Sequence, residues 1–168
     1  MKNKRVGSLV ILALMIGLNI VLSRFVSIKA MNFKISFTFL TIVLSAYFYG
    51  YYGAIMVALF GDLLGALLFP IGPYNPLLTL TSIMCAVVYA YFFYKKDLSN
   101  NNIILACLIN RFIISLFINT TIISLMYNLS FKATFITRIY SSTVMFVVEV
   151  LALCFLRKYM KYVENRRN

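Results

Sequence analysis

The chain is built from long apolar stretches that alternate with short segments rich in polar residues, proline or glycine. A bilayer core about 30 Å thick needs roughly 20 apolar residues per helix, and tilting or local thinning of the lipid accommodates shorter spans. Of the 168 residues, 62% are hydrophobic and 12% charged, whereas globular domains average roughly 45–50% and about 25%. A water-soluble fold could not cover this much apolar surface, so we predict an integral membrane protein.

We predict an all-α membrane protein, a bundle of six transmembrane helices that forms a single domain over residues 1–168. The boundaries follow polar residues and the Pro/Gly segment that contains Pro70, Gly72, Pro73 and Pro76. The expected helices run approximately over Gly7–Ser23, Ile35–Tyr49, Tyr51–Phe69, Leu77–Tyr94, Asn102–Tyr127 and Phe135–Arg157.

The first stretch begins like a signal peptide, but it runs directly into Ser23 and Arg24 without a small-x-small cleavage site, so we expect it to remain as a span. Six helices place both termini on one side of the membrane. Many of the 16 basic residues then share that side: Lys2, Lys4, Arg5, Lys95, Lys96, Arg157, Lys158, Lys161, Arg166 and Arg167. The positive-inside rule predicts that both termini are cytoplasmic in a multi-pass protein of the cell membrane.

Several function classes are disfavoured by composition. The net charge of +12 lies mostly between apolar runs, which argues against a nucleic-acid-binding surface. The chain has no histidine, and its three cysteines lie in apolar runs without C-x-x-C spacing. Asp62 and Glu149 are expected to differ in depth by about 10 Å or more. We therefore expect no enzymatic activity, no cofactor and no metal site.

Ionisable residues within the spans are costly and are usually paired or functional. Arg111 lies about nine residues from the cytoplasmic start of its predicted helix, and Glu149 about eight from the cytoplasmic end of the next. At about 1.5 Å per residue the two share nearly the same depth, which predicts an intramembrane ion pair. A structural role and direct contact with a substrate both remain open.

Two polar stripes on the last two predicted helices are expected to face each other. One contains Arg111, Ser115 and Asn119, and the other contains Arg138, Ser142 and Glu149. Asn119, Thr120 and Arg138 fall in the outer half, where they could line an outward-facing cavity or serve only as interhelical hydrogen bonds. The outer basic residues Arg24, Lys29, Lys34 and Lys132 fit either tolerated loop charges or a pocket that attracts an anion.

Small residues mark two surfaces for close helix packing. Asp62 neighbours the face formed by Ala54, Ala58, Gly61 and Gly65, where it could pair with an outer arginine or accept hydrogen bonds from a ligand amino group. The pair Ala13 and Gly17 fits either internal packing or the docking of a partner helix.

These residues resemble a known family. The stretches Ser23–Ile28, Lys34–Leu40, Gly61–Gly65 and Phe69–Tyr74, with Asn119-Thr120 and Arg138-Ile139 later in the chain, are similar to the substrate-binding S component of folate-type energy-coupling-factor (ECF) transporters. The resemblance implies a six-helix vitamin binder without its own ATPase, which joins a membrane scaffold subunit and two cytoplasmic ATPases. It also implies that Ala13 and Gly17 dock the scaffold.

The resemblance further implies folate or a related pterin as the ligand. Arg24 and Arg138 are then candidates for carboxylate recognition, because a guanidinium offers a planar fork of donors. Asp62 and Asn119 are candidates for the head group, Thr120 for the cavity lining, and Tyr74 for covering the ring. The segment Asn75–Thr79 and the lack of tryptophan depart from the family pattern, so another vitamin is an alternative ligand. A non-transporting membrane subunit of the cell-shape machinery is the alternative function.

Overall fold

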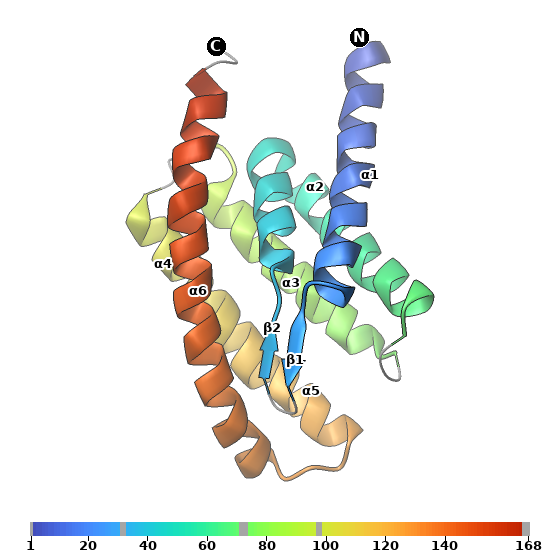
Figure 1. Cartoon of the computed structure of the whole chain (residues 1–168), viewed down its shortest axis with the longest axis vertical. Coiled ribbons are helices and arrows are strands. Elements are labelled where there is room, and N and C mark those ends of the chain that lie inside the picture. The colour runs from blue at the N-terminus through green and yellow to red at the C-terminus, as the bar shows by residue number, and fades with distance from the viewer. Residues whose placement is uncertain (1, 31–32, 71–73, 97–98, 166–168) are drawn as a thin grey trace.

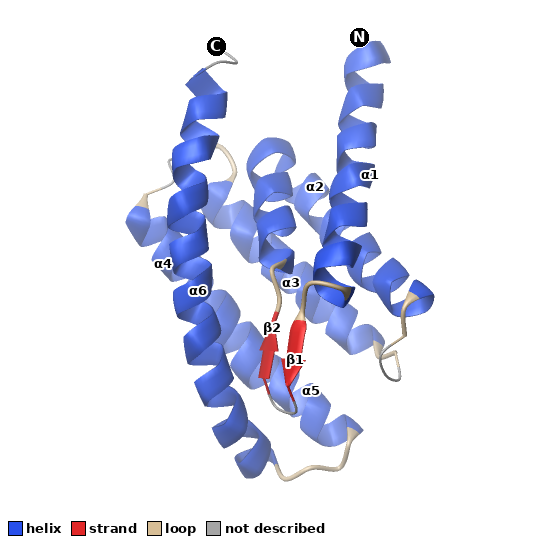
Figure 2. Ribbon diagram, viewed as in Figure 1, coloured by secondary structure: helices blue, strands red, loops and turns tan. Residues whose placement is uncertain are grey.

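The computed structural model describes residues 2–30, 33–70, 74–96 and 99–165, with side chains over 6–27, 36–70, 74–96 and 99–158. Helices account for most of this chain (Figures 1 and 2). The helices are α1 (Lys2–Arg24), α2 (Thr38–Leu68), α3 (Pro76–Phe93), α4 (Asn100–Leu108), η1 (Ile109–Ile118, a π-helix), α5 (Asn119–Met126) and α6 (Phe131–Asn165). Two short strands, β1 (Ile28–Ala30) and β2 (Phe33–Ile35), form a hairpin between α1 and α2.

Five helical stretches of the described chain are long and apolar enough to cross a membrane. They cover Val6–Arg24, Thr38–Leu68, Pro76–Phe93, Asn100–Met126 and Phe131–Lys158. Both termini lie at the same end of the bundle (Figure 1). The length and composition of these helices agree with the predicted membrane character, and the helical fold class is confirmed.

Gly50 interrupts α2. Its backbone is non-helical, with φ 68° and ψ −154°, and the ribbon turns back at the end of the bundle where the termini lie (Figure 1). A Cβ atom at this position would lie 2.8 Å from Cε2 of Tyr94, and a positive φ disfavours other residues. The interruption coincides with the boundary predicted between Tyr49 and Tyr51.

Other predicted boundaries differ from the structure by a few residues. The hairpin was not predicted. Because Ile35 belongs to β2, α2 begins at Thr38 and not at Ile35 as predicted. Asn75 caps α3 by accepting a hydrogen bond from the Leu77 backbone N–H at 2.9 Å, with Pro76 at the first helical position. The predicted features at Gly72, Pro73, Asp97, Leu98, Arg166 and Arg167 lie outside the described residues.

The small-residue face of α2 packs against α1. The Asn19 side chain donates to Thr41 Oγ1 at 2.7 Å, and a Cβ atom on Gly61 would lie 2.5 Å from Asn19 Oδ1. We call this contact of Asn19, Thr41 and Gly61 the α1–α2 seam. Ala13 and Gly17 are exposed, and a Cβ atom on Gly17 would meet nothing within 4 Å. These two residues are therefore not used in packing within the chain.

Candidate functional site

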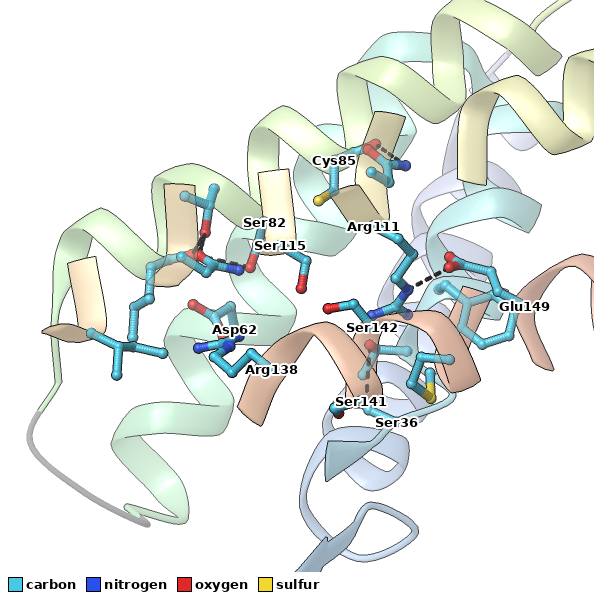
Figure 3. Close-up of a pocket in the computed structure, with 18 of the residues that line it drawn as sticks. Ser36, Asp62, Ser82, Cys85, Arg111, Ser115, Arg138, Ser141, Ser142 and Glu149 are labelled. Carbon is cyan, nitrogen blue, oxygen red and sulfur yellow. Dashed lines mark hydrogen bonds and ion pairs between the residues drawn. The ribbon is translucent and has the colours of Figure 1, made fainter. Parts of the chain in front are cut away.

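A pocket of about 730 Å³ lies among α2, α3, the α4–η1–α5 segment and α6. Ligand pockets commonly measure about 300–1,000 Å³. Most of the residues that line it have polar side chains: Ser36, Thr38, Asp62, Thr81, Ser82, Tyr89, Asn110, Arg111, Ser115, Asn119, Tyr127, Thr134, Thr137, Arg138, Ser141, Ser142 and Glu149. Figure 3 shows many of them pointing toward one another across the pocket.

A continuous stripe on η1 and α5 forms one wall of the pocket. It consists of Arg111, Ser115, Asn119, Ile123 and Tyr127, each four residues from the last. In a regular α-helix of 3.6 residues per turn, such a stripe drifts by about 40° at each step. The wider π turns, with i→i+5 hydrogen bonds, drift in the opposite direction. The π-helical segment therefore helps to keep all five side chains on the pocket.

Tyr89, Arg111 and Glu149 form one end of the pocket, which we call the inner ionic end. Arg111 Nε lies 2.6 Å from Glu149 Oε2, and the Tyr89 hydroxyl donates to Glu149 Oε1. The Glu149 side chain is 1% exposed, whereas that of Arg111 is 20% exposed. The structure thus brings together the two charges that were expected to pair, and it places both on the pocket wall (Figure 3).

Asp62 and Arg138 line the opposite end of the pocket (Figure 3), and Asn119, eight residues after Arg111 on the same wall, also lines the pocket. We call these three residues the outer polar end, after the orientation predicted from the sequence. Thr79 Oγ1 donates to Asp62 Oδ2, and Thr81 Oγ1 donates to Asn119 Oδ1, both at 2.7 Å. Arg138 lies eleven residues before Glu149 on α6, which corresponds to about 16 Å along the helix.

The Arg138 guanidinium is held differently from that of Arg111. No hydrogen bond or ion pair joins it to any other part of the chain that the structure describes. Its side chain is half-buried on the pocket wall. A guanidinium in this setting gains most from an acceptor that can take two parallel N–H bonds, such as a carboxylate.

Three of the predicted ligand-binding residues lie outside the pocket lining. The Arg24 Nε is buried beside Gly65, where a Cβ atom would be 3.2 Å from it. The Thr120 Oγ1 is buried and has no hydrogen-bond partner among the described residues. The Tyr74 hydroxyl lies 3.1 Å from Thr79 Oγ1, so Tyr74 reaches Asp62 through that threonine. Asp62 accordingly has Thr79 as its partner, in place of an outer arginine.

Sequence reasoning missed two residues of the pocket lining, Tyr89 and Asn110. Tyr89 lies in an apolar run, but it shares an α-helical spacing with the pocket residues Ser82 and Cys85, which lie seven and four residues before it. Asn110 lines the same pocket, and its Oδ1 is buried without a hydrogen-bond partner in the described chain. Asn110 lies beside Arg111 in sequence but outside the predicted stripe of Arg111, Ser115 and Asn119, so the periodicity argument did not include it.

Comparisons with known proteins agree with this geometry. Residues 7–158 match the family described as "ECF transporter, substrate-specific component". The chain is 33% identical over 150 residues to the "Folate transporter FolT" of Clostridium novyi (strain NT), covering 89% of this chain and 87% of that protein. It also resembles a solved structure, "Crystal structure of FolT bound with folic acid", with a TM-score of 0.80 and 32% identity over 86% of this chain and 88% of that one.

Proposed function

Because the chain belongs to the family of ECF transporter substrate-specific components, we propose that it binds folate, or a closely related pterin, in the pocket between α2, α3, η1, α5 and α6. It is a multi-pass integral membrane protein and a transport component, which confirms the expectation that it is not an enzyme. Two relatives of about one-third identity are named for folate, and this supports the choice of ligand.

The observation that carries the proposal is the guanidinium of Arg138, which has no partner among the described residues and lies in a large pocket with many polar residues in its lining. Folate has a flat pterin ring at one end and a glutamate with two carboxylates at the other. A charge-assisted, bidentate hydrogen bond matches a guanidinium to such a carboxylate. Arg138 therefore binds the glutamate end of the ligand.

Asp62 and Asn119 act at the same end of the pocket as Arg138. Their oxygens already accept hydrogen bonds from Thr79 and Thr81. The amide N–H next to the glutamate is the ligand donor closest to the carboxylates, so it is a suitable partner for Asp62. This assignment replaces the head-group role suggested by the resemblance, because an extended ligand cannot bring its ring and its tail to one place.

Arg24, Tyr74 and Thr120 support the site from outside its lining. Tyr74 orients Thr79, and through it the carboxylate of Asp62. Arg24 packs on Gly65 of α2, close in sequence to Asp62, and adds positive charge near the outer end. Thr120 follows Asn119, so its burial fixes the start of α5 beside the pocket.

The membrane arrangement follows from the break at Gly50. The described chain has five candidate spans, and in this proposal the parts of α2 before and after Gly50 cross separately, which makes six crossings. Both termini then face the cytoplasm, in agreement with the basic residues near them. The outer polar end of the pocket lies toward the opposite, external side.

Import requires partners, because a vitamin-binding subunit of this family supplies no ATP hydrolysis. The partners are a membrane scaffold subunit and two ATPases. Ala13 and Gly17 remain exposed on α1, and small residues at this spacing permit close approach of another helix. They form the docking surface for the scaffold.

The proposal is tested by purifying the chain in detergent from cells grown with folate. The protein is denatured, and any released small molecule is identified by mass spectrometry. Recovery of folate or another pterin supports the proposal. Recovery of an unrelated vitamin, or of no ligand together with no thermal shift when folate is added, overturns it. The latter result would favour the alternative of a structural membrane subunit.

A further inference from the structure

We propose that the face of α3 turned away from the pocket binds an anionic phospholipid, with the lipid phosphate at Lys96 and an acyl chain along the helix. This proposal goes beyond vitamin binding. It rests on the membrane arrangement proposed above, in which this end of the bundle faces the cytoplasm, so the lipid belongs to the cytoplasmic leaflet.

Exposed apolar side chains form a stripe along α3. Leu77, Leu80, Met84, Val87 and Tyr91 are between 37% and 56% exposed. At about 3.6 residues per turn, these five positions fall within an arc of about 80°. The residues of α3 that line the pocket lie outside this arc. The stripe therefore faces away from the pocket, and in a membrane it is open to lipid.

The length of this apolar stripe suits one lipid chain. Tyr91 lies eleven residues after Leu80, which corresponds to about 16 Å along the helix. The hydrocarbon core of a bilayer is about 30 Å thick, so one leaflet contributes about half of that distance. An acyl chain of the cytoplasmic leaflet can thus lie along the stripe from Tyr91 to Leu80.

Two lysines follow the stripe in the α3–α4 connection, toward the end of the bundle where both termini lie (Figure 1). Lys96 Nζ lies 4.1 Å from the centre of the Tyr91 ring, and Lys95 Nζ lies 5.3 Å from that of Tyr94. A ring attracts an ammonium within about 6 Å of its centre. No carboxylate of the described residues pairs with either lysine. Tyr91 therefore holds the Lys96 ammonium beside the stripe, with N–H groups available to an anion.

Arg157 brings a further cation to the same part of the bundle. Its Nη1 donates to the Asn100 side chain at the start of α4. Asn100 follows Lys96 by four residues, so their Cα atoms are at most about 14 Å apart. The acidic residue next to Lys96, Asp97, lies outside the described residues. We call Lys95, Lys96 and Arg157 the basic corner.

An anionic phospholipid matches both the basic corner and the apolar stripe. Basic residues at the cytoplasmic surface attract anionic lipids. Phosphatidylglycerol carries a phosphate and no cation, whereas the headgroup of phosphatidylcholine carries a quaternary ammonium that the basic corner repels. A soluble phosphate would contact the basic corner alone and would gain nothing from the apolar stripe. The occupant is therefore a lipid.

The test measures binding of phosphatidylglycerol and phosphatidylcholine, with identical acyl chains, to the purified full-length chain by native mass spectrometry. The wild type should prefer phosphatidylglycerol by about five- to twentyfold. Lys96→Gln removes the charge at similar side-chain length, and it should lower phosphatidylglycerol affinity about fivefold without changing phosphatidylcholine affinity. Tyr91→Leu keeps the apolar stripe but removes the ring, and it should lower phosphatidylglycerol affinity about two- to fivefold.

Lys132→Gln is the matched control, because Lys132 is an exposed cation near the opposite end of α6. It should keep the wild-type preference, and a loss equal to that of Lys96→Gln would show a nonspecific charge effect and overturn the proposal. A wild-type chain without the preference, or Lys96→Gln that retains it, also overturns the proposal. In the latter case the basic corner serves another partner.

Two further measurements separate the remaining explanations. Glycerol 3-phosphate at the lipid concentration should not displace phosphatidylglycerol, and full displacement would mean a site for a soluble anion and refute the lipid proposal. Folate binding and thermal unfolding are measured for each variant, and Lys96→Gln should match the wild type in both because Lys96 is exposed and outside the pocket lining. A wild-type chain that prefers phosphatidylglycerol but binds no folate supports the lipid site and refutes the proposed function.

Discussion

The α1–α2 seam and the pocket use polar groups in opposite ways. In the seam, Asn19 donates to Thr41 and lies so close to Gly61 that an added Cβ would force the Asn19 side chain to shift. In the pocket, Arg138 has no partner in the described chain, and Arg111 uses only its Nε. Buried polar groups normally have all their partners within the protein. The difference supports the proposal that the seam is a packing surface and that the pocket binds a ligand.

The largest loss of stability is expected from breaking the ion pair of Arg111 and Glu149 in the pocket wall. Arg111→Leu leaves Glu149 buried without its cation, which should lower the free energy of unfolding by about 3–5 kcal/mol. Reversible unfolding in detergent or bilayers measures this loss. The double variant Arg111→Leu/Glu149→Leu should recover part of it. Strictly additive effects of the two single replacements would show that the pair contributes no coupling.

Arg138→Ala is the corresponding test of an unsatisfied charge. It should weaken folate binding by about 1.5–3 kcal/mol, because a hydrogen bond to a charged group is lost. The free energy of unfolding should change little, since no described residue pairs with Arg138. Titration calorimetry measures the affinity. Lys132→Ala, an exposed cation on the same helix, is the matched control and should leave folate affinity unchanged.

Gly61→Ala tests whether the seam is as closed as its geometry indicates. The added Cβ would lie 2.5 Å from Asn19 Oδ1, so we expect a loss of about 1–3 kcal/mol in the free energy of unfolding. Gly17→Ala is the control, because nothing lies within 4 Å of its added Cβ. In the isolated protein it should be neutral or stabilising by up to about 1 kcal/mol. Equal effects at the two positions would contradict the distinction between a packed and an open surface.

The smallest effect is expected at Thr81, which connects α3 to Asn119 across the pocket. Thr81→Val keeps the side-chain shape but removes the hydrogen bond to Asn119 Oδ1. The net loss should be about 0.5–1.5 kcal/mol in the free energy of unfolding. Thermal denaturation without ligand measures it. A larger loss would mean that the outer polar end is already held together as tightly as the seam.

Most of the helices were predictable, because hydropathy indicates the membrane spans and Gly and Pro residues indicate where they end. The break at Gly50 and the equal depths of Arg111 and Glu149 follow from counting residues along regular helices. The hairpin at residues 28–35 was not predicted, since its short strands give no period long enough to detect. Nor was the π-helix, because its wider turns arise from packing and carry no local sequence signal.

The sequence predicted those site residues that recur at regular helical spacing along one face of a helix. Asn119 and Arg138 were placed on a cavity by their positions in two stripes, and both line the pocket. Asn110 lies outside the predicted stripe, and Tyr89 joins the site through a contact with another helix, so neither stood out from its neighbours. Arg24 was assigned to the ligand on resemblance, and its distance from the pocket lining depends on how α1 packs on Gly65.

The central claim is that Arg138 binds a carboxylate of the ligand, because no carboxylate of the described chain pairs with it. The most direct measurement compares the affinities of folate and pteroate, which lacks the glutamate, for the wild type and for Arg138→Ala. The wild type should prefer folate by roughly ten- to a hundredfold, and the variant should bind both ligands almost equally. If the variant keeps the full preference for folate, another group recognises the glutamate and the proposed role of the outer polar end is refuted.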